Sequence, residues 1–216
     1  MASINPENLY GDRLFTSLER NDPAAGMLLL AAPGMLSPEF ARSVIFLIEH
    51  DEHGTLGVDL TQRSQTPVHN VLEPWASLMA KPPVLYVGGP VNQTQPICIG
   101  VVRNGATLPE ETDSINSITG APLMERIAHR FALVNLGAEP EDVRDRIDGA
   151  RIFAGYAGWD PGQLEDELDR GDWYVAPALP SDVLAPAAAD IWGDCMRRQP
   201  WPLPLYGTYP VDVRDN

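Results

Sequence analysis

A strand that leads directly into a helix is encoded in the run Gly155-Tyr156-Ala157-Gly158-Trp159-Asp160-Pro161-Gly162-Gln163-Leu164-Glu165. The apolar residues 150–156 predict the strand, because a short continuous apolar run bounded by glycine is typical of buried strands. Asp160, Pro161 and Gln163 form a capping box, with aspartate as N-cap, proline at the first helical position and glutamine at the third. Gly171 then predicts the end of the helix.

Apolar runs on both sides of this junction predict further strands. We expect strands at residues 26–32, 43–48, 55–60, 84–87, 97–102, 131–136, 150–156 and 173–176. Apolar spacing and helix-capping residues predict helices at residues 67–80, 123–127, 139–147, 160–171 and 186–198. Some connections are short enough for hairpins, such as the polar bend 49–54 between two strands. The predicted fold class is therefore α+β, or mixed α/β, rather than a purely parallel sheet.

The length and charge of the chain limit the classes of protein it can belong to. It has 216 residues, with 15 Lys+Arg against 30 Asp+Glu and a formal net charge of −15. Hydrophobic residues make up 44%, which excludes a disordered chain, and the acidic charge disfavours direct binding of nucleic acid, which depends on Lys and Arg. We expect one domain over 1–216, with 1–24 as an N-terminal helical extension and 200–216 as a proline- and aromatic-rich tail lying on the surface.

Several motifs that would indicate a location or a cofactor are absent from the sequence. No segment has the pattern of a signal peptide or a membrane span, so we expect a cytoplasmic protein. Cys98 and Cys195 match no metal or redox spacing and fit a reducing compartment. The patterns Gly-x-x-x-x-Gly-Lys, Gly-x-Gly-x-x-Gly and Gly-x-Ser-x-Gly are also missing. We therefore expect no cofactor and assign no catalytic residue.

Four segments of the sequence together resemble a known family. In chain order they are Gly26-Met27-Leu28-Leu29-Leu30-Ala31-Ala32-Pro33, residues 42–51, Gly88-Gly89-Pro90-Val91 and residues 155–165. They resemble the AlgH/YqgE family of bacterial proteins, over about residues 26–200. The resemblance implies a bifurcated, mixed β-sheet with a small barrel-like part, surrounded by helices. It implies no established reaction, although some members carry a transcriptional-regulator label.

The sequence departs from this family pattern after the third predicted strand. Leu60-Thr61-Gln62-Arg63 stands where members often have Leu-Asn-Arg-Pro, and Asp59 replaces an apolar strand residue. A role that depends on the family's asparagine or arginine therefore does not carry over to this chain.

Polar residues at the start of the predicted strand 43–48 are the first candidates for a binding site. Arg42 could hold a carboxylate or phosphate through two hydrogen bonds, or it could pair with Glu39 or Glu49 and fix the hairpin. We favour the ion pair because the chain is rich in acids. Ser43 is a weak candidate nucleophile, since the elbow motif and a nearby base are both missing.

Glu49 and His50 lie in the predicted polar bend and are also candidate ligand-binding residues. Together with His53 they could bind a metal, since two imidazoles at His-x-x-His spacing can share an ion. The alternative is a solvated hairpin bend, which we favour because no third strong ligand is close in sequence. We therefore expect no metal.

Glycine pairs supply further candidates. Gly88 and Gly89 could form an anion-binding nest, although such a pair more often ends a strand in a tight turn. At the strand–helix junction, the candidate ligand-binding residues are Gly155, Tyr156, Gly158, Trp159 and Gln163. A helix N-terminus and two aromatic rings could hold a flat anionic ligand there. The alternative, which we favour, is a packing corner in which the tryptophan fills the core.

Three hypotheses about function follow. The first is a non-enzymatic regulatory or stress-related protein that binds a protein partner or a small anionic ligand. The second is a small hydrolase acting on a nucleotide or a phosphorylated metabolite, and the third is a transcriptional regulator that does not contact DNA directly. Clustering of the polar candidates around one pocket would favour the hydrolase. Burial of each candidate beside its own partner would favour the binding protein. The sequence leaves the oligomeric state open.

Overall fold

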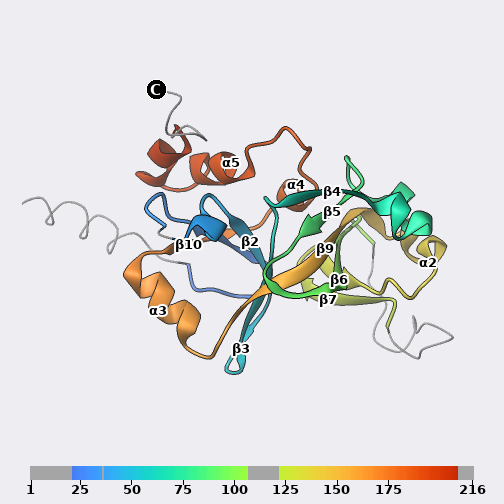
Figure 1. Cartoon of the computed structure of the whole chain (residues 1–216), viewed down its shortest axis with the longest axis horizontal. Coiled ribbons are helices and arrows are strands. Elements are labelled where there is room, and N and C mark those ends of the chain that lie inside the picture. The colour runs from blue at the N-terminus through green and yellow to red at the C-terminus, as the bar shows by residue number, and fades with distance from the viewer. Residues whose placement is uncertain (1–20, 36, 107–121, 209–216) are drawn as a thin grey trace, which may run out of the picture.

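The computed structural model describes residues 21–35, 37–106 and 122–208, and these residues form a large curled sheet with helices around it (Figure 1). The strands are β1 (Met27–Ala31), β2 (Val44–Asp51), β3 (Gly54–Asp59), β4 (Arg63–Pro67), β5 (Val84–Val87), β6 (Val91–Val102), β7 (Met124–Ala128), β8 (Phe131–Val134), β9 (Ile147–Trp159) and β10 (Trp173–Pro177). The helices and single helical turns are η1 (Pro38–Phe40), η2 (Val68–Asn70), η3 (Glu73–Leu78), α2 (Pro140–Arg144), α3 (Gln163–Arg170), α4 (Pro180–Val183), α5 (Ile191–Arg197) and η4 (Leu203–Thr208).

The sheet divides at the long strand β9. Its main path runs β10-β1-β2-β3-β9-β6-β8-β7, and β5 joins β9 from the side with β4 at its outer edge. β3 pairs with the C-terminal end of β9 at residues 157–159, whereas β5 pairs in parallel with residues 153–154. The bifurcated mixed sheet with a curled, barrel-like half is therefore confirmed, and so is the α+β class.

β5 and β6 lie on opposite edges of β9. Phe153 is opposite Tyr86 of β5 and opposite Ile97 of β6, so the two strands flank it. The three residues between β5 and β6, Gly88-Gly89-Pro90, must therefore carry the chain across the face of β9. The crossing brings two backbones close together and explains why glycine stands at positions 88, 89 and 155.

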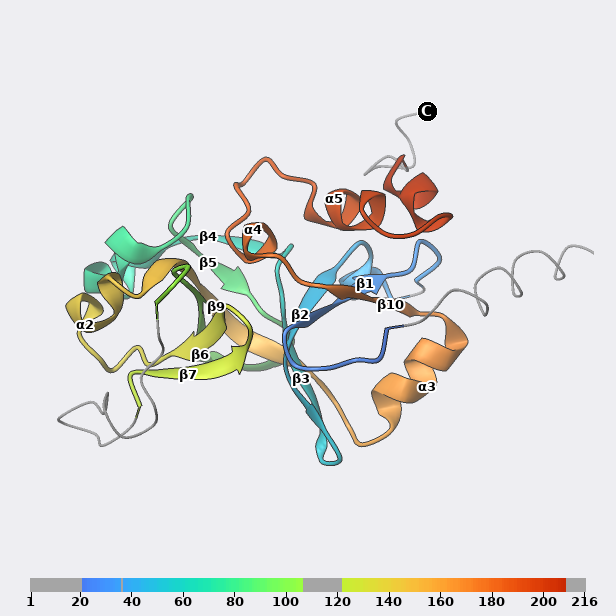
Figure 2. The same ribbon diagram turned by 180° about the vertical axis from the view of Figure 1, so that it is seen from behind.

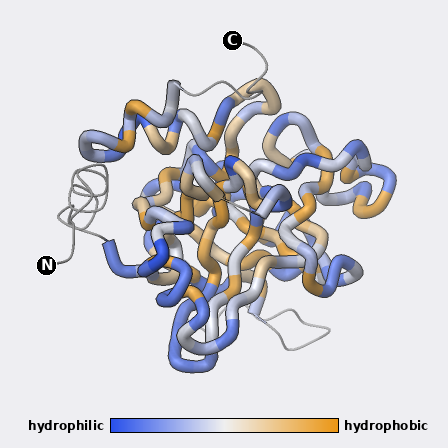
Figure 3. Tube along the Cα trace, turned by 60° about the vertical axis from the view of Figure 1, so that its left-hand side comes forward, coloured by the Kyte–Doolittle hydropathy of each residue, from blue (hydrophilic) through white to orange (hydrophobic). Residues whose placement is uncertain are grey.

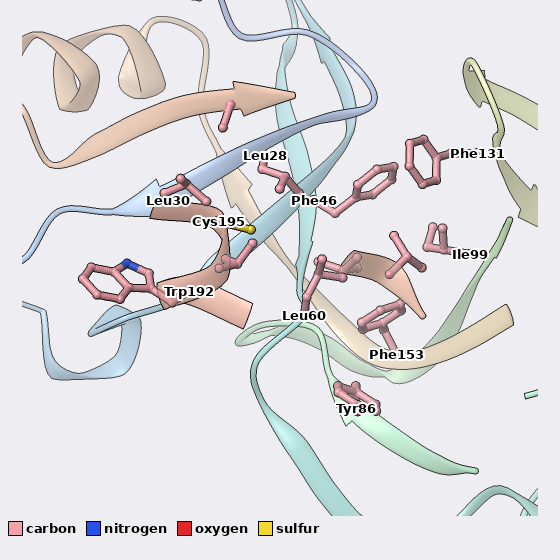
Figure 4. Close-up of a cluster of buried hydrophobic side chains, with 14 of the residues drawn as sticks. Leu28, Leu30, Phe46, Leu60, Tyr86, Ile99, Phe131, Phe153, Trp192 and Cys195 are labelled. Atoms are coloured by element: carbon pink, nitrogen blue, oxygen red, sulfur yellow. The ribbon is translucent and has the colours of Figure 1, made fainter. Parts of the chain in front are cut away.

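Three apolar clusters hold the layers together. The largest lies between the sheet and the segment that contains α4, α5 and η4, and Figure 4 shows Trp192 and Cys195 of α5 near Leu28 and Leu30. A second cluster packs the start of β9 against η2, η3 and α2. The third packs the opposite face of β1 and β2 against α3, which lies on the other side from α5 (Figure 2). The hydrophobic segments accordingly gather in the middle of the molecule and the hydrophilic ones outside (Figure 3).

Two predicted helices are wrong. Residues 67–80 form the end of β4 and the short turns η2 and η3, because Pro74 interrupts the helical hydrogen bonds that this segment would need. Residues 123–127 belong largely to strand β7, which pairs with β8. Its sequence Met-Glu-Arg-Ile-Ala suits a helix by propensity, and pairing with a neighbouring strand overrides this local preference.

Other boundaries differ from the sequence-based expectation. Glu49, His50 and Asp51 belong to strand β2 rather than to a bend, and the turn follows at Glu52 and His53. The predicted helix 139–147 ends at Arg144 because Ile147 already begins β9. The predicted helix 186–198 starts only with α5, after the separate short helix α4.

The two chain ends are only partly described. The expected helix in 1–24 lies almost entirely outside the described residues. In the tail, residues 203–208 form η4, which packs against α5 and buries Leu203, so this part is not merely draped on the surface.

Candidate functional site

Arg42 forms an ion pair that links the start of β2 to the segment before α5. Its Nη2 donates a hydrogen bond of 2.8 Å to Oδ1 of Asp190, and the guanidinium lies over the Trp192 ring at 4.2 Å from the centroid. The backbone at Arg42 has φ of 58°, an uncommon conformation for a residue other than glycine. Arg42 therefore forms an ion pair, as we favoured, but with Asp190 rather than with Glu39 or Glu49, so the pair attaches the segment before α5 instead of fixing the hairpin.

Ser43 and Asp59 form a buried hydrogen-bonded pair between β2 and the end of β3. Ser43 Oγ donates to Asp59 Oδ2 at 2.6 Å, and the other carboxylate oxygen accepts from the backbone N and Oγ1 of Thr61. Asp59 and Thr61, which both depart from the family pattern, are therefore hydrogen-bonded to each other. Burial raises the pKa of Asp59 above its usual 3.8, and the hydrogen bonds from Ser43 and Thr61 oppose this rise.

The raised pKa predicts that Asp59→Asn changes how stability depends on pH. A raised folded-state pKa means that protonation of Asp59 favours the folded state, so its contribution is full below about pH 3.8 and is lost as the pH rises through the folded-state pKa. Between about pH 4 and 7 the variant should therefore lose less stability than the wild type. Urea denaturation at several pH values measures this. The exposed Asp142→Asn serves as control, and identical pH profiles for Asp59→Asn and wild type would contradict the expectation.

His50 and Glu49 point to different surroundings from the same strand. His50 Nδ1 is 2.7 Å from Thr55 Oγ1, and its Nε2 is 3.7 Å from a carboxylate oxygen of Glu165 on α3. Glu49 is exposed, and the side chain of His53 is 83% exposed at the hairpin turn. Within the described ranges, no three His, Cys, Asp or Glu side chains are grouped in a way that could hold a metal.

The two cysteines are buried free thiols in different clusters. Burial raises the pKa of both thiols, that of Cys195 to about 12. A thiol held in its neutral form is a poor nucleophile and a poor metal ligand, so both cysteines serve as packing residues.

Gly88, Gly89 and Gly155 make the crossing over β9 possible. A Cβ at Gly88 would lie 2.2 Å from the carbonyl oxygen of Gly155, and one at Gly89 would lie 2.2 Å from the Tyr156 backbone. The Gly88 amide donates to the Ala154 carbonyl at 2.9 Å, so it is not free to bind an anion. Close approach of two backbones explains Gly88, Gly89 and Gly155 without a ligand.

The junction between β9 and α3 is organised by a carboxylate on the helix. Oε2 of Glu167 accepts hydrogen bonds from the indole Nε1 of Trp159 at 2.9 Å and of Trp173 at 2.8 Å. The two rings meet edge to face, with centroids 6.0 Å apart. Gln163 donates from Nε2 to the other oxygen of Glu167 and accepts from the Asp160 amide through Oε1. The packing corner is therefore what the structure contains at this place.

Helix α3 itself begins later than the capping box predicts. Gly162, with φ of 79°, is the N-cap, and Gln163 is the first helical residue. The glutamine half of the capping box forms, whereas no side chain caps the helix at Gly162. Gly171 ends the helix with φ of 81°, as predicted.

One shallow hollow brings several candidates together. Glu49, Tyr156, Gly158 and Trp159 line a space of about 390 Å³ between the β2–β3 hairpin and β9, together with Asp51, His53, Gly54, Thr55, Leu56, Val91 and Asp160. We call it the acidic hollow, because three carboxylates and no lysine or arginine line it. Arg42, Ser43, His50, Gly88, Gly89, Gly155 and Gln163 do not line it.

A second hollow was missed by sequence reasoning altogether. It has a volume of about 460 Å³, and Lys81, Arg103 and Arg144 are among the residues that line it. Lys81 is the only lysine of the chain, and this was the one feature of the sequence that could have pointed to the second hollow. The other basic residues come from distant parts of the sequence, so only the fold brings them together.

The fold and these sites define the class of protein: a mixed α+β chain built on a bifurcated, half-barrel sheet. A family model described as AlgH-like matches residues 28–204, and the chain belongs to this family.

Relatives and solved structures agree with this assignment. A UPF0301 protein of Corynebacterium efficiens is 52% identical over 209 residues, covering 97% of this chain and 99% of that one. A UPF0301 protein of Mycobacterium tuberculosis is 48% identical over 192 residues, covering 89% and 90%. The crystal structure of a Corynebacterium diphtheriae protein superimposes with a TM-score of 0.84 at 50% identity, covering 93% of this chain and all (100%) of that one.

The solution structure of AlgH from Pseudomonas aeruginosa shares the fold at greater distance. Its TM-score is 0.59 at 23% identity, over 90% of this chain and 100% of that one. The names of these relatives give a family and state no activity. In the part of the chain that the structure describes, no helix is long and apolar enough to cross a bilayer.

Proposed function

We propose that this protein is a non-enzymatic regulatory protein that recognises a basic segment of a protein partner through the acidic hollow. The supporting observation is that several polar candidate residues are already bound to partners within the fold. Arg42 is paired with Asp190, Ser43 with Asp59, and the tryptophan corner with Glu167. Each of these side chains is bound to its own partner and holds two elements together. This arrangement supports a binding protein over a hydrolase, which needs its polar residues gathered around one pocket.

The lining of the acidic hollow suits a cationic side chain. Glu49, Asp51 and Asp160 offer carboxylates at its rim, while Tyr156 and Trp159 offer aromatic surface. A guanidinium or ammonium group gains from both, through charge pairing and through contact with a ring face. The net charge of −15 adds long-range attraction for a basic partner and repels nucleic acid. On this proposal, any regulatory effect works through protein contacts.

Binding of a dye-labelled hexa-arginine peptide, followed by fluorescence anisotropy, tests the proposal. We expect saturable binding that weakens about tenfold in the double variant Asp51→Asn/Asp160→Asn, since two ion pairs at the hollow are lost. The matched control is Asp142→Asn/Asp145→Asn, which removes the same charge from exposed positions on and after α2. Equal weakening in both double variants would show that only overall charge attracts the peptide, and would contradict the proposal.

A further inference from the structure

We infer a second binding site, for a small phosphate monoester with an apolar body, in the hollow that contains Lys81, Arg103 and Arg144. We call it the basic hollow. It is separate from the acidic hollow, shares none of its lining residues, and is independent of the proposed function. The inference follows from how the walls are built, from the charges on them, and from the volume and the apolar residues of the lining.

The walls come from three segments that the backbone fixes firmly. One wall is the segment 77–81, which is bound to β9 by the hydrogen bond from the Ala80 amide to the Ala150 carbonyl at 2.9 Å. Arg103, directly after β6, donates from its own amide to the Arg146 carbonyl and from Nη2 to the Ile147 carbonyl. The third segment is the end of α2, which carries Arg144. The basic groups are therefore presented from a preformed frame, which lowers the entropic cost of binding.

The charges in the basic hollow leave an excess of positive charge. Asp148 is the one acid among its lining residues, and both Arg103 and Arg130 pair with this carboxylate. Lys81 makes no ion pair with any residue that the structure describes. Arg144 contacts Ser77 and the exposed Glu141 at 3.2 and 3.4 Å, which are long, exposed interactions that an anion can replace.

A buried cation bonded to one wall of the hollow, Arg151, adds to its positive potential. Arg151 lies two residues beyond Gly149 on β9, and the residue is 2% exposed. It donates to the carbonyls of Val183 and Ala185, on either side of Leu184, which lines the hollow. Its Nη1 has no hydrogen-bond partner, and no carboxylate in the described ranges pairs with it. A buried charge is screened little by solvent, so it favours an anion nearby.

The floor and the volume indicate what else the ligand carries. The lining also includes five apolar residues, Leu78, Met79, Ile147, Leu184 and Pro186, which we call the floor. A volume of about 460 Å³ exceeds what a bare phosphate needs and lies within the range of small-molecule sites. A phosphate dianion matches the cluster of two guanidinium groups and one ammonium group, and an apolar body matches the floor.

The single lysine allows a direct test on the whole chain. Labelling with ¹⁵N-lysine gives one backbone amide signal, that of Lys81, in a proton–nitrogen correlation spectrum. We expect phenyl phosphate to move this signal in a saturable way, with millimolar affinity or tighter, and phenol to leave it in place. Inorganic phosphate should bind more weakly than phenyl phosphate, because it cannot use the floor. Added salt should weaken both phosphates.

Arginine variants decide whether the signal reports the basic hollow. Arg144→Gln should weaken phenyl phosphate by about threefold to fivefold, and Arg103→Gln/Arg144→Gln by about tenfold or more. Arg170→Gln should have no effect. It removes an exposed arginine at the end of helix α3, away from the hollow, where Arg170 pairs with Asp172. A cooperative thermal unfolding transition like that of the wild type shows that each variant is folded. No saturable shift, or equal affinity in all variants, would overturn the site, and equal affinity for inorganic phosphate would overturn the apolar body.

Discussion

Gly88→Ala is expected to destabilise the protein by about 3 kcal/mol or more, which is a large part of the roughly 5–15 kcal/mol that stabilises a typical domain. The reason lies in the crossing over β9, where a Cβ at this position would lie 2.2 Å from the carbonyl oxygen of Gly155. The same Cβ would also crowd Phe153 and Val58, each at 3.1 Å. Neither backbone can move away, because the Gly88 amide and carbonyl are hydrogen-bonded to Ala154 and Asp59.

Chemical denaturation measures this effect, with Gly34→Ala as the matched control. Gly34 has open space around its Cβ position and no left-handed backbone, so its substitution should change the free energy of unfolding by less than about 0.5 kcal/mol. A Gly88→Ala variant as stable as Gly34→Ala would show that the two backbones are not in contact as described.

Glu167→Ala is expected to cost about 3 kcal/mol of stability, which is unusual for a half-buried glutamate. The substitution removes the acceptor of two indole N–H groups, those of Trp159 and Trp173, whose side chains are nearly buried. Each donor left without a partner costs about 1–3 kcal/mol, and solvent reaching this partly exposed corner keeps the sum at the lower end. The loss should loosen α3 from β10 and from the end of β9.

Denaturation followed by tryptophan fluorescence measures the loss at this corner. Glu167→Gln keeps an oxygen acceptor and should recover about half of the stability. Glu165→Ala, on the exposed side of the same helix, should cost less than about 0.5 kcal/mol, because its contact with His50 is 3.7 Å long and solvated. Equal effects of Glu167→Ala and Glu165→Ala would contradict the assigned role of the carboxylate.

These structural roles change how the family-like segments are interpreted. The residues that carry the resemblance, such as Gly88, Trp159 and Arg42, close the bifurcated sheet and attach its helices. The two hollows differ in this respect: the acidic hollow is lined mostly by residues of these same segments, such as Glu49, Tyr156 and Trp159, whereas none of the residues that line the basic hollow belongs to them. The family-like segments therefore serve both the fold and the acidic hollow, and only the basic hollow has to be looked for outside them.

The sequence by itself determined the elements whose signal is local. The apolar runs identified β1, β2, β3, β5 and β10, and the position of Gly171 identified the end of α3. A buried strand is recognisable because both of its faces are apolar, and a helix end because few residues other than glycine adopt a left-handed backbone there. The family resemblance added the bifurcated sheet.

The tertiary structure alone decided the elements and contacts that depend on a distant partner. β4 and β7 lie at the edges of the sheet and each is paired on one side; β4 is polar and β7 is mixed, so pairing rather than a continuous apolar run makes them strands. Arg42 meets Asp190 across 148 positions, and Lys81 shares a hollow with Arg103 and Arg144. Contacts of this kind leave no periodic pattern in the sequence, because the free energy that selects them comes from groups brought together only when the chain folds.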